Sequence, residues 1–207
     1  ARLLARDELI EHAWEARVLS PADGNSAEAI EETFRAGPLD AEAHTLNVRQ
    51  VAARRAFHAA YIVQHVGDLQ DAADLYERSL ALFPSSEGHT FLGWVHSFMG
   101  DLDRAVAECE KAIDVDPTFG NPYNDIGAYL IELERYADAI PWLKKALESE
   151  RYCCYFYAHT NLGRVYMLQG RRELARKHLE EALKVNPGYD PAREMLRRIR
   201  SGIDYVA

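Results

Sequence analysis

The feature that most constrains this chain is a short pattern that recurs at nearly constant spacing. A glycine follows an aliphatic residue at Gly93, Gly127 and Gly163, and these glycines are 34 and 36 residues apart. Glycine inside a helix costs about 1 kcal/mol relative to alanine, so three glycines in one register need a packing reason. Periods of this length indicate stacked supersecondary units that bury their apolar faces against one another.

Each unit reads as a helix, a tight turn, a second helix and a stop. In the stretch Phe91–Pro117, Gly100 and Asp101 mark the turn, and the proline ends the unit. We expect the glycine of each first helix to lie close to the second helix, because without a Cβ it admits a neighbouring backbone. The small residues expected to face the three glycines are Ala105, Ala139 and Ala175.

This pattern resembles the tetratricopeptide repeat (TPR) family over about residues 53–187, in four units. Four positions depart from the family's pattern: Ala60 stands for a glycine, Ser79 for an alanine, Glu134 for the turn glycine and Arg151 for the final proline. The resemblance implies antiparallel helix pairs stacked into a right-handed superhelix. It also implies a concave groove that binds peptides or partner proteins.

The expected fold is therefore all-α, an α-solenoid of stacked antiparallel helix pairs with about 11 helices. Helical periodicity and breakers predict two short helices over residues 2–19 and 27–36, and a long helix from about Ala41 to His65. The expected domains are an N-terminal helical hairpin over 1–40, which is a degenerate repeat, four TPR units over 41–188, and a capping helix with a tail over 189–207.

Charge is unevenly distributed along the 207 residues, whose net charge is −9. Residues 1–150 carry a net charge of −14, whereas residues 151–207 carry +5. An acidic body is poorly suited to a phosphate backbone, so we expect no nucleic-acid partner. The asymmetry suits a charged protein partner or head-to-tail self-contact; the alternative is an ordinary solvated surface. We expect a monomer or a weak homo-oligomer.

The three cysteines favour a reducing compartment, and we expect a cytoplasmic protein without a membrane span. Cys109 falls on a helix face that should be buried, and Cys153 and Cys154 are adjacent and not expected to pair with each other. The chain begins at Ala1, which is compatible with an upstream targeting or lipoprotein segment that has been removed.

No catalytic or phosphate-binding motif is present, so we expect no enzyme, no cofactor and no metal. Two pairs of histidines lie seven residues apart, whereas a metal held on one helix prefers a spacing of three or four. Three histidines fall where repeats of this kind usually place aromatic residues, which favours packing. These are His89, His96 and His159.

Residues on the inner face of each first helix form the candidate binding groove. Large aromatic side chains there are of the type found at binding hot spots, and asparagine offers both a donor and an acceptor to a peptide backbone. The candidate groove residues are Arg54, Phe57, Tyr61, Trp94, Asn121, Asn124, Asp125, Tyr157, Asn161 and Arg164. The alternative is that the aromatics pack on neighbouring repeats and the asparagines are merely solvated.

The sequence thus predicts a protein–protein interaction scaffold that binds a peptide or a partner-protein segment in its concave groove. The alternative is an assembly subunit that uses its acidic body and basic C-terminal end for contacts with its neighbours. Few basic residues lie on the inner face, which argues against acidic chaperone tails as the partner. The identity of the partner cannot be read from the pattern.

Overall fold

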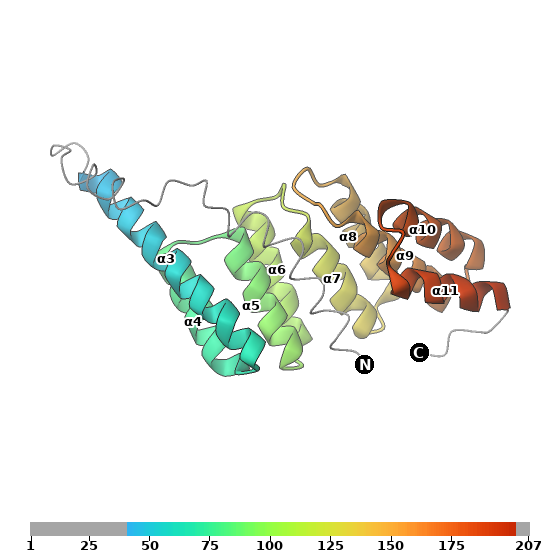
Figure 1. Ribbon diagram of the computed structural model, residues 1–207, viewed down its shortest axis with the longest axis horizontal. Coiled ribbons are helices and arrows are strands. Elements are labelled where there is room, and N and C mark those ends of the chain that lie inside the picture. Colours follow the sequence, from blue (N-terminus) through green and yellow to red (C-terminus); the bar gives the residue numbers. More distant parts are fainter. Residues whose placement is uncertain (1–40, 202–207) are drawn as a thin grey trace. The chain divides into compact units, whose positions relative to one another are not determined.

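The computed structural model describes residues 41–201, and every regular element in this range is an α-helix (Figure 1). The nine helices are α3 (Ala41–Val66), α4 (Leu69–Leu82), α5 (Ser86–Phe98), α6 (Leu102–Val115), α7 (Asn121–Glu132), α8 (Tyr136–Glu148), α9 (Tyr155–Leu168), α10 (Arg172–Val185) and α11 (Asp190–Ser201). About eleven helices are predicted from the sequence. The two helices predicted for residues 2–19 and 27–36 lie outside the described residues.

Two compact units divide the chain, residues 1–51 and residues 52–207. The second unit contains the helix pairs α5–α6, α7–α8 and α9–α10. Within that unit two hydrogen bonds join α3 to α4. The Tyr76 hydroxyl donates to Gln64 Oε1 at 3.0 Å, and Ser79 Oγ donates to the carbonyl of Ala53 at 2.8 Å.

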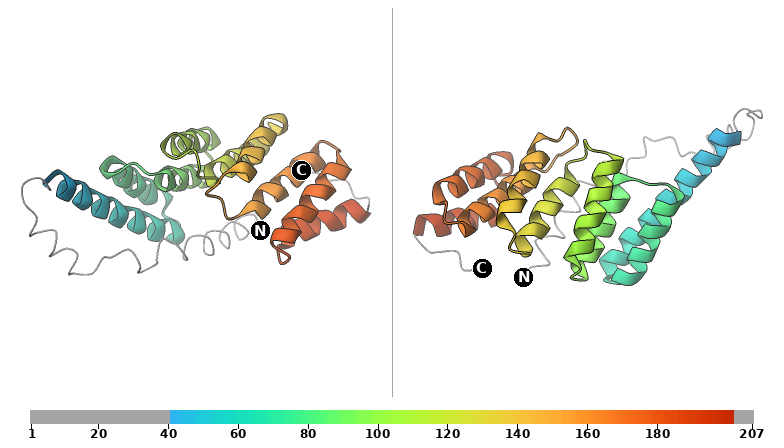
Figure 2. Two further views of the ribbon diagram at one scale, coloured as in Figure 1. Left: turned by 90° about the horizontal axis from the view of Figure 1, so that it is seen from above. Right: turned by 180° about the vertical axis from the view of Figure 1, so that it is seen from behind.

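Consecutive helices in the second unit form pairs: α5 with α6, α7 with α8, and α9 with α10 (Figures 1 and 2). Each pair contacts the next through α6 and α7, through α8 and α9, and finally through α10 and α11. The first helices of successive pairs also contact one another, α5 with α7 and α7 with α9. This second set of contacts places α5, α7 and α9 in one layer.

Local capping explains where several helices begin. Asp68, Ser85 and Asp101 precede α4, α5 and α6, and each side chain accepts a hydrogen bond from the backbone N–H three residues later. The helix α7, in contrast, begins without a side-chain cap. Gly120 precedes this helix, and its N–H is held by the carbonyl of Arg151 at 3.1 Å.

The repeated glycines mark places of close approach between the two helices of a pair. A Cβ on Gly127 would lie 2.4 Å from Leu143 Cδ2, and one on Gly163 would lie 2.7 Å from Leu179 Cδ2. At Gly93 the nearest atom is the carbonyl oxygen of Ala105, at 3.1 Å. The predicted close approach is therefore confirmed, and Ala105 and Ala175 lie near Gly93 and Gly163 as expected. At Gly127 the expectation of Ala139 is wrong, because the Leu143 side chain is the nearest group.

The turn within each pair needs a left-handed residue. Gly100 has φ 87° and Gly170 has φ 71°, whereas in the middle pair Glu134 takes this conformation with φ 59°. A residue with a Cβ pays a steric cost in this region. The departure from the family's pattern at Glu134 is thus a departure in side chain and not in backbone geometry.

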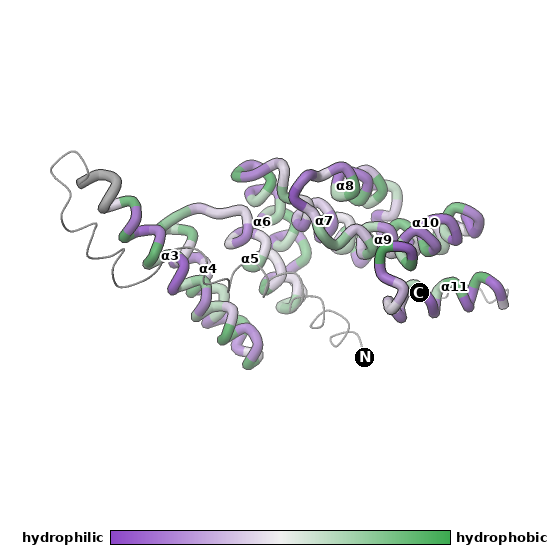
Figure 3. Tube along the Cα trace, turned by 45° about the horizontal axis from the view of Figure 1, so that its top comes forward, coloured by the Kyte–Doolittle hydropathy of each residue, from purple (hydrophilic) through white to green (hydrophobic). Residues whose placement is uncertain are grey.

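The interior of the stack is formed by side chains from successive helices. Ile126, Leu143, Leu162 and Val165 are fully buried in one cluster that runs from α6 to α10. Figure 3 shows hydrophobic and hydrophilic residues alternating along the helices, as expected for elements with one buried stripe. None of the helices described is both long and apolar enough to cross a lipid bilayer.

Candidate functional site: a polar ladder across three helices

The three first helices α5, α7 and α9 each place polar side chains at one level of their shared layer. Trp94 on α5, Asn124 and Asp125 on α7, and Asn161 on α9 are members of the predicted groove. Trp94 directly follows the packing glycine Gly93. On the other two helices, Asn124, Asp125 and Asn161 lie two or three residues before the packing glycine, so the repeat register fixes their position on each helix.

These four residues form one continuous hydrogen-bonded chain, which we call the polar ladder. Trp94 Nε1 donates to Asp125 Oδ2 at 2.5 Å, and Asn124 Nδ2 donates to Asp125 Oδ1 at 3.3 Å. Asn161 Nδ2 in turn donates to Asn124 Oδ1 at 3.1 Å. The ladder therefore links three successive helix pairs through side chains that are 31 and 37 residues apart in sequence.

Burial along the ladder is graded. Asn124 is buried, with 9% of its surface exposed, whereas Trp94, Asp125 and Asn161 are partly exposed. The Trp94 ring also packs on Phe91, with ring centroids 4.4 Å apart. Because their neighbours hold them, the exposed parts of Trp94 and Asn161 are pre-positioned, which lowers the entropic cost of binding a partner.

The ladder keeps hydrogen-bonding capacity in reserve. Asn161 uses one amide proton within the ladder, which leaves its second N–H and its carbonyl oxygen for another group. On the same helix, Tyr157 lies one turn before Asn161 and Arg164 one turn after it. Arg164 is partly exposed, and its Nε is enclosed with no acceptor among the described residues. Tyr157, Asn161 and Arg164 are thus partly exposed polar residues on successive turns of α9.

The remaining predicted residues lie away from the ladder. Phe57 is buried, with 7% exposed, and its ring meets Tyr76 and Phe91 at 5.2 and 5.1 Å. It therefore packs the core and has little surface to offer a partner. Tyr61 is partly exposed, and its ring packs at a tilt against His65, with ring centroids 4.2 Å apart. Arg54 is exposed, and Asn121 begins α7.

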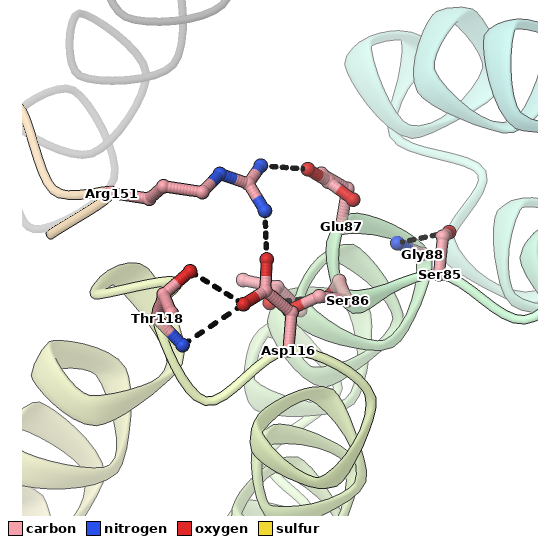
Figure 4. Close-up of polar contacts among 8 residues, drawn as sticks. Ser85, Ser86, Glu87, Gly88, Asp116, Thr118 and Arg151 are labelled. Atoms are coloured by element: carbon pink, nitrogen blue, oxygen red, sulfur yellow. Dashed lines mark hydrogen bonds and ion pairs between the residues drawn. The ribbon is translucent and has the colours of Figure 1, made fainter. Parts of the chain in front are cut away.

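A second polar cluster, which no pattern in the sequence predicts, is centred on Arg151 (Figure 4). Its Nη2 lies 2.7 Å from Glu87 Oε1 at the start of α5, and its Nη1 contacts Asp116 at the end of α6. The Arg151 N–H also donates to the carbonyl of Thr118 at 3.0 Å. Arg151 stands where the repeat pattern has proline, which has no N–H and no charge.

The histidines are also partnered in ways that spacing alone does not reveal. His89 Nδ1 lies 2.7 Å from Glu108 Oε2, and His159 Nδ1 lies 3.1 Å from His178 Nδ1. Burial, the charge of His159 and nearby lysines lower the pKa of His178 to about 4. Within residues 41–201 no group of three or more His, Cys, Asp or Glu side chains is arranged to hold a metal ion.

Comparison with family models identifies three copies of one repeat. The tetratricopeptide repeat matches residues 86–119, 123–151 and 156–189. These ranges correspond to the pairs α5–α6, α7–α8 and α9–α10, whose first helices carry the ladder.

Known proteins of similar sequence or structure support the same reading of the fold. The chain is 35% identical over 82 residues to the Protein SGT1 homolog of Oryza sativa subsp. japonica, and the match spans 39% of this chain but only 21% of that protein. The Pseudomonas aeruginosa PilF structure superposes with a TM-score of 0.70 at 21% identity, over 74% of this chain and 70% of that one. YrrB, described as a TPR protein with an unusual peptide-binding site, gives 0.59 at 17% identity, over 82% and 96%.

Proposed function

Because this chain is a tetratricopeptide repeat protein, we propose that it is a non-enzymatic scaffold that binds an extended segment of a partner protein across α5, α7 and α9. The observation that carries this proposal is the polar ladder. It joins the first helices of all three matched repeats and leaves donors and acceptors of Asn161 available. Repeat proteins use such quasi-linear surfaces to bind long partners.

The proposed binding mode follows from the chemistry of these side chains. An extended chain presents alternating N–H and C=O groups, and the amide of Asn161 can pair with both kinds of group. The exposed part of the Trp94 ring offers an apolar contact to a partner side chain. Arg164 is partly exposed and its guanidinium carries further donors, so the partner should place a carbonyl or carboxylate oxygen beside the exposed part of this side chain.

Similar structures are compatible with this function. YrrB is described as having a peptide-binding site, and its likeness to this chain extends over most of both chains. At 17% identity this likeness concerns the fold.

Affinity capture with matched variants tests the proposal. Wild type, Asn161→Ala and Arg104→Ala are used as baits, and the proteins retained are quantified by mass spectrometry. Arg104 lies on the second helix α6, with 73% of its side chain exposed, so it controls for mutation outside the ladder. We expect at least one partner to be lost with Asn161→Ala and kept with Arg104→Ala. Equal retention by all three baits would contradict the proposed site.

A second candidate function is favoured by the separation of charge along the chain. Residues 1–150 are acidic, with a net charge of −14, and residues 151–207 are basic, with +5. The amphipathic helix α11 carries Arg193, Arg197 and Arg200 on its exposed surface. Copies of the chain would then associate end to end as an assembly subunit. Light scattering at low and high salt tests this function, because only such contacts should weaken with salt.

A further inference from the structure

Cys153 and Cys154 lie at the end of the link between α8 and α9, and their two sulfur atoms are 3.1 Å apart. Side chains of adjacent residues in an extended chain point to opposite sides, so this convergence is specific to the local backbone. Cys154 has φ −110° and ψ 45° and directly precedes α9. The thiols are not bonded to each other, as expected for adjacent cysteines. The two sulfurs nevertheless need to move only about 1 Å to form a disulfide, so the geometry permits a bond that the sequence alone does not predict.

We propose that this pair is a site of reversible oxidation, at which a low-molecular-weight disulfide such as glutathione disulfide closes a Cys153–Cys154 disulfide ring. This inference is independent of the proposed binding function. It assigns a covalent modification to a segment that lies beside the candidate site but is not part of it.

The two sulfurs differ in a way that fixes the order of events. Cys153 is exposed and Cys154 is buried. The contact with Cys153, followed by burial, raises the pKa of the Cys154 thiol. The reactive species in exchange is the thiolate, so Cys153 reacts first and Cys154 resolves the intermediate.

The reaction balances as two successive exchanges. Cys153 loses its proton, and the thiolate attacks one sulfur of glutathione disulfide, forming a mixed disulfide and releasing one glutathione thiolate. Cys154 then loses its proton and attacks the Cys153 sulfur, which releases the second glutathione thiolate. The two protein thiols lose two protons and two electrons. The electrons pass to glutathione disulfide, which is reduced to two molecules of glutathione, so no other oxidant is needed.

The product should be easy to reduce again. Most disulfides join residues whose Cα atoms are about 4.4–6.8 Å apart. Adjacent residues joined by a trans peptide bond are held about 3.8 Å apart, so the ring has to form under strain. Strained, accessible disulfides are the labile ones, which suits a reversible modification.

Neighbouring contacts determine where the strain is absorbed. On the N-terminal side, Arg151 is fixed by backbone hydrogen bonds to Thr118 and Gly120. Tyr152 is buried, and its ring lies where a Cβ on Gly120 would be. On the C-terminal side, the carbonyl of Cys154 accepts the N–H of Tyr157 at 2.9 Å. The first turn of α9 should therefore be the part that loosens when the ring closes.

The test uses the full chain in glutathione buffers that range from reducing to oxidising. Remaining thiols are alkylated, and the digested protein is analysed by mass spectrometry. We expect the peptide that contains Cys153 and Cys154 to become lighter by two hydrogens and to resist alkylation, and excess reduced glutathione to reverse the change. A lasting mixed disulfide on Cys153, or alkylation of both thiols at the oxidising end, would overturn the proposal.

Variants and hydrogen exchange complete the test. Cys154→Ser should accumulate the mixed disulfide at Cys153, and Cys153→Ser should leave Cys154 unmodified, so either variant suffices if the other fails to fold. Cys109→Ser is the matched control and should close the ring like wild type, because Cys109 is fully buried on α6. The Tyr157 amide should exchange several-fold faster in the oxidised protein. Unchanged exchange would exclude the loosening of α9.

Discussion

Trp94 Nε1 donates a 2.5 Å hydrogen bond to Asp125 Oδ2, across the boundary between two matched repeats. The contact joins α5 to α7, and these two residues are 31 positions apart in sequence. Because the acceptor is a carboxylate and both residues are partly buried, this bond belongs to the stronger class of charge-assisted hydrogen bonds. It fixes the indole at the edge of the surface that we propose binds a partner.

Trp94→Phe tests the structural part of the ladder. The change removes the indole N–H and leaves the Asp125 carboxylate with one donor fewer, so we expect a loss of about 1–3 kcal/mol in the free energy of unfolding. Chemical denaturation followed by circular dichroism measures it. Trp142→Phe is the matched control, because the Trp142 ring lies near Tyr123 and Lys145 on another part of the surface. Equal losses for the two variants would contradict a specific role for the bond.

Arg151→Ala tests the polar cluster in which Arg151 joins its own repeat to Glu87 and Asp116 of an earlier one. The guanidinium contacts Glu87 and Asp116, although 42% of the side chain is exposed and solvent screens the pairs. We expect a loss of about 1 kcal/mol at low salt, because two carboxylates share one cation, and a smaller loss in 1 M salt. Arg176→Ala is the control, since its partners Glu173 and Glu180 lie on the same helix. A loss for Arg151→Ala that is independent of salt would argue for packing rather than charge.

Glu134→Gly should stabilise the protein. Glu134 holds φ 59° at a turn where two other pairs have glycine, and removing the Cβ relieves about 1 kcal/mol of steric cost. The reciprocal change Gly100→Ala, at φ 87°, should destabilise by a similar amount. Thermal unfolding of both variants checks the pair. A lower melting temperature for Glu134→Gly would mean that the side chain contributes something the backbone geometry does not reveal.

The His159–His178 pair predicts a loss of stability in acid. Burial and the charge of His159 lower the pKa of His178 from 6.5 to about 4, and burial lowers the pKa of His159. Lys177 and Lys144 act in the same direction on His178, whereas Glu181 opposes them. The unfolded chain then binds more protons than the folded one between these values, so stability should fall as pH drops from about 6.5 to 4.

Melting temperatures measured across this pH range provide the check. His178→Gln should flatten the acid limb of the curve. His65→Gln should not, because His65 is exposed at the end of α3. An unchanged acid limb in His178→Gln would assign the pH dependence to other groups.

The fold was largely predictable because its signals are local. Glycines such as Gly127 and Gly163 recur at a nearly constant spacing and mark positions where two helices lie close together. The turn residues separate one helix from the next. The long helix predicted over Ala41–His65 is observed as Ala41–Val66. The contact that holds the start of α7 was not predictable, because the carbonyl of Arg151 accepts the Gly120 N–H, and Arg151 lies far along the chain, where a local capping rule does not apply.

For the candidate site, the sequence predicts which residues share one face of the stack but not how they contact one another. The repeat register places Trp94, Asn124, Asp125 and Asn161 in one layer, but the hydrogen bonds among them depend on how three helix pairs are stacked. The same register wrongly treats Phe57 as equivalent to the exposed aromatics, although Tyr76 and Phe91 enclose it. Arg151 and Glu87 are 64 residues apart in sequence, and local spacing rules do not predict contacts between residues so far apart.

The measurement that tests the central claim most directly is the affinity of one captured partner segment for wild type, Asn161→Ala and Arg104→Ala, with circular dichroism to show that each variant is folded. Our account predicts that Asn161→Ala raises the dissociation constant at least about tenfold, which corresponds to a loss of about 1.4 kcal/mol in binding free energy. Arg104→Ala should bind like wild type. A segment that binds folded Asn161→Ala as tightly as wild type would contradict the claim that the polar ladder is the binding site.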